Sequence, residues 1–186
     1  MPYQISSPGG NEYRFFDIKN VRYESERIAY TEFLNPYYHI HLKPDKLKQF
    51  TPYFSSKDFN SHFYIDVNKA FNRHQEADYV YVYFTLESAQ PFGSDVYIYG
   101  ALTGYKADSS NYMTYNLEKE IYEKTLLLKQ GFYDYAYVTK DYNKSEIAFD
   151  LTEGTHAETE NDYIILVYLR KPVSDIDRLI GYKIIN

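Results

Sequence analysis

Tyrosine is the sequence feature that most constrains how this chain folds. The 186 residues include 24 Tyr and 12 Phe but no Trp. Aromatic side chains favour β-strands because their rings pack well on a pleated, half-buried surface. Each one removes about 150–250 Å² from water when it is buried. Hydrophobic residues make up 44% of the chain, which is enough to build a core. The composition therefore predicts a folded, tyrosine-rich, all-β protein.

Short strand-like segments follow one another and are separated by turn residues. In a first β-rich region, 1–72, which we interpret as a partial sandwich, strands are expected at 13–18, 27–33, 37–42 and 62–67. A polar stretch, 68–77, follows as a hinge. In a second region, 77–186, strands are expected at 79–86, 96–102, 112–116, 121–128, 132–138, 146–151, 163–169 and 179–185. Eight short strands in about 110 residues are typical of a β-sandwich.

The segment 117–130 has features of both a helix and a strand. Its charged residues, such as Glu118 and Lys119, suit a helix. Tyr122, Lys124, Leu126 and Leu128 instead alternate along the chain, which would place them on one face of a strand. We predict that this segment is an arm of a β-hairpin.

Charge and composition exclude several classes of function. Lys and Arg total 20 against 26 Asp and Glu, a net charge of -6, so nucleic-acid binding is not expected. There is no cysteine, which excludes disulfides, thiolate metal sites and a cysteine nucleophile. No apolar run is long enough for a membrane-spanning helix. The first residues, MPYQISSPGG, lack the basic, apolar and small-residue pattern of a signal peptide.

Two groups of residues are weak candidates for a metal site. His39 and His41 are two residues apart in an expected strand, so their imidazoles would share a face, but no spacing supplies a third ligand. Glu158, Glu160 and Asp162 would also share a face if extended and could collect calcium. Solvated acidic residues of this kind are equally compatible with a plain surface.

The sequence contains no catalytic or cofactor-binding motif. It lacks a nucleophile elbow, an H-E-x-x-H zinc motif, a phosphate-binding glycine loop and a dinucleotide fingerprint. We therefore predict a non-catalytic protein without a cofactor.

Tyr105 and Tyr112 flank a polar loop and are candidates for carbohydrate binding. Exposed tyrosine rings can stack on the apolar face of a sugar. The alternative is that Tyr105 caps the open edge of the sandwich core. Both interpretations stay open from the sequence.

Part of the second region resembles the early-set immunoglobulin-like modules that include glycogen-binding domains. The resemblance rests on residues 96–105, on Met113-Thr-Tyr-Asn116 and on residues 129–135. Tyr105 stands where those modules carry a sugar-stacking Trp, and Ala136 stands where they often carry a Lys. The resemblance implies the sandwich fold and, as one function, glycan binding of the glycogen-binding type.

Nearly the whole chain resembles a second family, the plug proteins of the type IX secretion system of Bacteroidota. Five motifs occur in the order of that family: GGNEYRFFD (9–17), ADYVYVYF (77–84), LLKQGFYDY (127–135), ETENDY (158–163) and DRLIG (177–181). Members of the family are about twice as long, with an extra N-terminal β domain and a secretory signal. The resemblance implies that this chain corresponds to the C-terminal half.

The plug-protein resemblance implies a non-catalytic, protein-binding role. The plug closes the outer-membrane translocon barrel from its periplasmic side, so the expected location is the periplasm, at the outer membrane. The expected partner is that barrel protein, and the sequence assigns no interface residues. The alternative is a carbohydrate-binding module.

Overall fold

The computed structural model describes residues 11–21, 25–51, 62–66, 78–142, 146–156, 163–172 and 175–185. The all-β prediction is confirmed, because these residues contain strands and a single short 3-10 helix, Ala101–Thr103, but no α-helix. The predicted hinge, 68–77, lies outside the described residues.

Twelve strands are observed in the described residues. They are β1 (Arg14–Asp17), β2 (Ile28–Leu34), β3 (Tyr37–Leu42), β4 (Phe63–Ile65), β5 (Tyr79–Glu87), β6 (Asp95–Tyr99), β7 (Tyr112–Asn116), β8 (Ile121–Lys129), β9 (Gly131–Lys140), β10 (Ile147–Ala148), β11 (Tyr163–Arg170) and β12 (Asp177–Ile185). Each predicted strand segment overlaps one of them. Within 117–130, residues 117–120 form a turn and Ile121–Lys129 form strand β8, which pairs with β7, so the prediction of a hairpin arm rather than a helix is confirmed.

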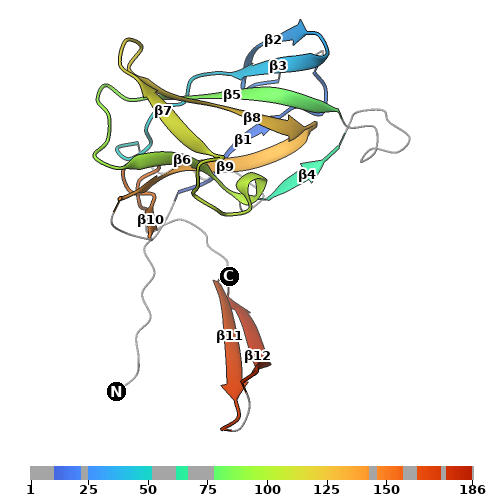
Figure 1. Ribbon diagram of the computed structural model, residues 1–186, viewed down its shortest axis with the longest axis vertical. Coiled ribbons are helices and arrows are strands. Elements are labelled where there is room, and N and C mark those ends of the chain that lie inside the picture. The colour runs from blue at the N-terminus through green and yellow to red at the C-terminus, as the bar shows by residue number, and fades with distance from the viewer. Residues whose placement is uncertain are drawn as a thin grey trace.

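Ten of the strands form one sheet (Figure 1). Eight of them follow one another in the order β1-β9-β6-β7-β8-β5-β3-β2. Strands β4 and β10 also pair with β9, which is ten residues long and therefore has room for several neighbours. The pairings are antiparallel except for β3 with β5. Figure 1 shows that the sheet curls, so that β5 and β8 lie over β9 and β1.

The core lies inside this curl. Along β5, Val80, Val82, Phe84 and Leu86 alternate with more exposed residues and are almost completely buried. Aromatic rings connect the opposite walls: the ring of Phe84 lies 5.5 Å from that of Phe16 on β1 and 5.3 Å from that of Tyr135 on β9. Aromatic rings therefore span the core from wall to wall, and aliphatic side chains such as those of β5 fill the rest.

The two regions predicted from the sequence contribute strands to the same sheet. From the region 1–72, β3 pairs with β5, and both β1 and β4 pair with β9. These pairings cover edges that the first region would otherwise leave open. The boundaries at 72 and 77 and the specific immunoglobulin-like identity of the sandwich stay predictions.

Candidate functional site

The hairpin of β11 and β12 forms a separate two-stranded sheet. Figure 1 shows that it extends away from the ten-stranded sheet. Two cross-strand partners in an antiparallel pair point to the same face. The register pairs Ile164 with Ile184, Leu166 with Tyr182 and Tyr168 with Leu179. We call these six residues the apolar face of the hairpin.

The apolar face is exposed to solvent. Its side chains are between 49% and 72% exposed. It ends at Arg170, whose Nε and Nη2 each donate a hydrogen bond of 2.7 Å to the carboxylate of Asp177. The opposite face is mixed, because Ile165 faces Lys183 and Leu169 faces Arg178. One face of the hairpin is thus entirely apolar and bordered by an ion pair, which is the composition of an interface core and its rim.

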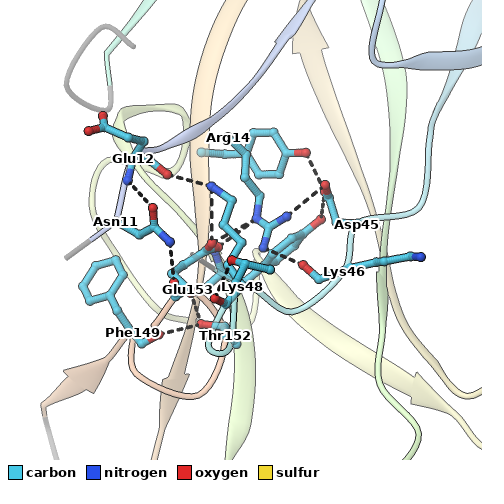
Figure 2. A network of polar contacts seen from close by, with 12 residues as sticks. Asn11, Glu12, Arg14, Asp45, Lys46, Lys48, Phe149, Thr152 and Glu153 are labelled. Carbon is cyan, nitrogen blue, oxygen red and sulfur yellow. Dashed lines mark hydrogen bonds and ion pairs between the residues drawn. The ribbon is translucent and has the colours of Figure 1, made fainter. Parts of the chain in front are cut away.

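A buried polar cluster lies where the sheet curls back on itself (Figure 2). At its centre, the carboxylate of Asp45 is 2% exposed. Its Oδ1 accepts hydrogen bonds from Arg14, at 3.1 Å, and from Arg27. Its Oδ2 accepts from the hydroxyls of Tyr135, at 2.6 Å, and Tyr137, at 2.9 Å. Four bonds fill the acceptor sites of this carboxylate, so Asp45 is not available as a general base.

Glu153 is the second buried carboxylate of the cluster. It accepts hydrogen bonds from Nε of Arg14 at 2.9 Å and from the backbone N–H of Tyr137 at 2.8 Å. Arg14 therefore joins β1 both to the segment after β3, which carries Asp45, and to the turn after β10, which carries Glu153 (Figure 2). The cluster links the two ends of the sheet order, β1 and the β2–β3 pair.

Burial and charge shift the pKa values of several groups in the cluster. Burial alone lowers the pKa of Arg14, but the carboxylates of Glu153 and Asp45 outweigh it and raise that pKa. Burial and the Asp45 carboxylate raise the pKa values of Tyr135 and Tyr137 well above the ordinary range. Burial lowers the pKa of Lys48, and the Glu153 carboxylate only partly offsets it. The arginine stays charged and the two tyrosines stay neutral at physiological pH.

A cavity of about 410 Å³ opens beside the cluster and is lined in part by Arg14, Arg27, Asp45 and Lys48. Lys48 Nζ donates to the carbonyl oxygen of Glu12 at 2.8 Å and lies 3.9 Å from Glu153. The charged groups at the cavity wall are therefore held by partners within the chain. This arrangement supports a structural role for the cluster, namely joining the ends of the sheet.

The two tyrosines predicted to bind carbohydrate lie on the same side of β6 but contact different rings. Tyr105 is 47% exposed, and its ring lies 6.0 Å from that of Tyr99. Tyr112 is 38% exposed, and its ring lies 5.7 Å from that of Tyr97. Carbohydrate binding by Tyr105 and Tyr112 stays a prediction.

The predicted metal ligands divide into two cases. Glu158, Glu160 and Asp162 lie outside the described residues. His39 Nδ1 lies 2.8 Å from the hydroxyl of Tyr83, and His41 Nε2 lies 3.1 Å from Glu32 Oε1. Where the structure describes the chain, no group of three or more potential ligands could hold a metal ion.

Neither the polar cluster nor the apolar face of the hairpin is predicted by the motifs in the sequence. Arg14 alternates with Phe16 toward the inside of β1, and a charged residue at an inward position is a signal for a buried ion pair. Residues 163–169 form a continuous apolar run, which is typical of a strand covered on both faces. That run was the available signal for an interface.

No family model matches the chain, and no curated protein matches its sequence. The fold is similar to the crystal structure of a hypothetical protein from Parabacteroides merdae ATCC 43184, with a TM-score of 0.93 and 34% identity. The match covers 96% of this chain and 45% of that protein. The chain therefore spans less than half the length of the protein it matches.

The comparison also bears on the hairpin. Strands β11 and β12 and their turn make up more than a tenth of the chain. A match over 96% of the chain therefore includes most of the hairpin. In the part of the chain that the structure describes, no helix is long and apolar enough to cross a membrane.

Proposed function

We propose that this chain is a non-catalytic protein-binding module of the bacterial envelope, located in the periplasm at the outer membrane. Its proposed partner is an outer-membrane translocon barrel, as the resemblance to type IX secretion plug proteins implies. The observation that carries the proposal is the exposed apolar face of the β11–β12 hairpin. A solvent-exposed face of six large apolar side chains is typical of a protein interaction site.

The chemistry of the hairpin favours a protein partner over a lipid surface. Tyr168 and Tyr182 combine large ring area with a hydroxyl group, a combination enriched in protein interfaces. The chain carries a net charge of -6, which opposes approach to anionic lipid headgroups. A two-stranded hairpin is marginally stable in water by itself, so covering its apolar face on a partner stabilises it.

The test is an affinity pull-down of the tagged chain from solubilised outer membranes of the source bacterium, with identification of the barrel by mass spectrometry. The double variant Leu166→Glu/Tyr182→Lys makes the apolar face polar but retains an attractive cross-strand pair. We expect the wild type to recover the barrel and this variant to lose it.

The matched control is Ile165→Glu, which adds a charge on the mixed face opposite Lys183. It is expected to recover the barrel like the wild type. Failure of the wild type to recover the barrel would overturn the proposed partner. Equal recovery by the wild type and the double variant would overturn the assignment of the interface to the apolar face.

A further inference from the structure

Three aromatic rings form a ladder on the outer face of the ten-stranded sheet. Tyr30 on β2, His41 on β3 and Tyr83 on β5 are cross-strand neighbours in one row. The ring centroids of Tyr30 and His41 are 4.2 Å apart at an angle of 12°, and those of His41 and Tyr83 are 4.1 Å apart at 10°. The three rings are therefore stacked face to face along the hydrogen-bonding direction of the sheet.

The ladder ends at the next strand. The partner of Tyr83 on β8 is Thr125, a small and exposed side chain. Among the described residues, both rings that contact Tyr83 belong to β3, namely His39 and His41. One face of the Tyr83 ring is stacked on His41, and the other face is turned toward β8. This second face borders the space above Thr125.

A groove of about 820 Å³ occupies this part of the outer face. Besides the ladder rings, it is lined by the polar residues Thr85, Thr114, Thr125 and Glu123, by Lys119 and Lys124, and by Phe84 and Ile121. Thr85 and Thr114 are the two cross-strand neighbours of Glu123, so these three polar side chains form one row beside the row of Tyr83 and Thr125. The groove combines a flat ring face with a row of hydrogen-bonding groups.

The charged side chains that line the groove, Lys119, Lys124 and Glu123, each have a partner within the chain. Lys119 Nζ lies 4.0 Å from Glu123 Oε2, and His41 Nε2 lies 3.1 Å from Glu32. Lys124 Nζ donates to the backbone carbonyl of Ser109 at 3.4 Å. Because the charged groups of the lining already have partners, an uncharged ligand with hydroxyl groups suits the groove.

The Tyr83 ring is also held in place before any ligand arrives. Its hydroxyl lies 2.8 Å from His39 Nδ1, and one of its faces is stacked on His41. A ring fixed in this way loses little conformational entropy on binding, which favours affinity.

We infer that this groove binds a neutral oligosaccharide. One sugar ring stacks on the β8-facing side of Tyr83, above Thr125, and continues the ladder. The hydroxyl groups of the sugar bond to Thr85, Thr114 and Glu123. A sugar matches the groove because it presents an apolar C–H face and a rim of hydroxyl groups, whereas a purely apolar ligand would leave the polar row without partners. This site is separate from Tyr105 and Tyr112 and independent of the hairpin.

The experiment titrates the purified chain with the hexaoses of the malto-, cello-, xylo-, manno- and N-acetylchito- series, each to about 10 mM, and measures binding by calorimetry and tyrosine fluorescence. We expect saturable binding of at least one sugar. Tyr83→Ala should weaken that binding about tenfold or more, because it removes the stacking face.

A second variant tests the same site and keeps the contacts of Tyr83 with His39 and His41. Thr125→Tyr places a fourth ring where the sugar would stack, and should abolish binding while the variant unfolds at the same or a higher temperature. The matched control is Leu127→Tyr, the next outward position on β8, which should bind the sugar like the wild type.

Three outcomes would overturn the inference. The first is that none of the five sugars binds. The second is that Thr125→Tyr binds as tightly as the wild type. The third is that Tyr105→Ala, rather than Thr125→Tyr, abolishes binding, which would place the sugar in the loop predicted from the sequence. None of these outcomes depends on whether the chain recovers a translocon barrel.

Discussion

The ten-stranded sheet and the β11–β12 hairpin differ in where their apolar side chains go, although their strands have similar compositions. In the sheet, alternate residues of β5 such as Val82 and Phe84 are at most 1% exposed, because they pack against the opposite wall. In the hairpin, Leu166 and Tyr182 are 49% and 72% exposed. The sheet buries its own apolar residues, whereas the hairpin leaves them exposed to solvent.

This difference predicts that the two regions contribute differently to the stability of the molecule. The sheet has a core and a buried polar cluster that joins its ends, so its stability comes from contacts within the chain. The hairpin has one cross-strand ladder and an exposed ion pair. Changes in the sheet should therefore alter the free energy of unfolding, while changes in the hairpin should alter mainly binding.

The largest expected effect is that of removing the central carboxylate of the polar cluster. Asp45→Ala leaves Arg14, Arg27 and two tyrosine hydroxyls without their shared acceptor. Arg14 keeps Glu153 as a partner, but breaking its buried pair with Asp45 and leaving two buried hydroxyls without an acceptor still costs about 3–5 kcal/mol. Urea denaturation should show this loss in the free energy of unfolding. A loss below about 1 kcal/mol would show that the cluster does not join the ends of the sheet.

The second effect is a loss of stability at alkaline pH. The unfolded chain deprotonates its tyrosines near pH 10, whereas Tyr135 and Tyr137 keep their protons because their pKa values are raised in the folded state. The folded state then binds more protons than the unfolded state, so stability falls as pH rises above about 10. Each tyrosine contributes about 1.4 kcal/mol per pH unit to this fall.

The test is to measure the free energy of unfolding of the wild type and of the double variant Tyr135→Phe/Tyr137→Phe from neutral to alkaline pH. The difference between the two curves gives the contribution of these two tyrosines to the loss of stability. The double variant is less stable at neutral pH because it lacks two hydrogen bonds to Asp45. Its stability should nevertheless fall less steeply above about pH 10. An equally steep fall in both proteins would assign the alkaline loss to other groups.

The third prediction compares one substitution in the two regions. A Cβ atom at Gly131, in β9, would lie 2.4 Å from the backbone oxygen of Tyr64, so Gly131→Ala forces β4 and β9 apart. We expect a loss of about 1–3 kcal/mol in the free energy of unfolding. At Gly181, in β12, no atom lies within 4 Å of the added Cβ, so Gly181→Ala should have no destabilising effect. Equal losses would contradict the packing difference between sheet and hairpin.

The strands could be predicted from the sequence because their signal is local. In β5 the alternation of buried and exposed residues marks the strand, and in β7 the turns on either side mark its ends. The predicted strand 112–116 agrees with the observed bounds of β7. The predicted strand 96–102 ends earlier, at Tyr99, because Gly100, with φ 140°, leads into the 3-10 helix Ala101–Thr103.

The sites could not be predicted in the same way because their residues come from distant parts of the chain. Arg14 and Glu153 are 139 residues apart in sequence. The end of the aromatic ladder at Thr125 depends on the register of four strands, β2, β3, β5 and β8, which no local pattern encodes. The exposure of Tyr105 and Tyr112 was accessible from the sequence because both residues flank a polar loop.

The smallest expected effect is in the hairpin. Arg170→Ala removes the bidentate pair with Asp177, but both side chains are largely exposed, so the free energy of unfolding should stay almost unchanged. The same variant should open the hairpin more often, because it removes a contact at the turn end of the two strands. Hydrogen exchange measures both effects: amides of β11 and β12 should exchange faster than in the wild type, while those of β5 and β9 stay unchanged. If β5 and β9 also exchanged faster, hairpin and sheet would unfold as one unit, and the apolar face would contribute to the stability of the sheet as well as to binding.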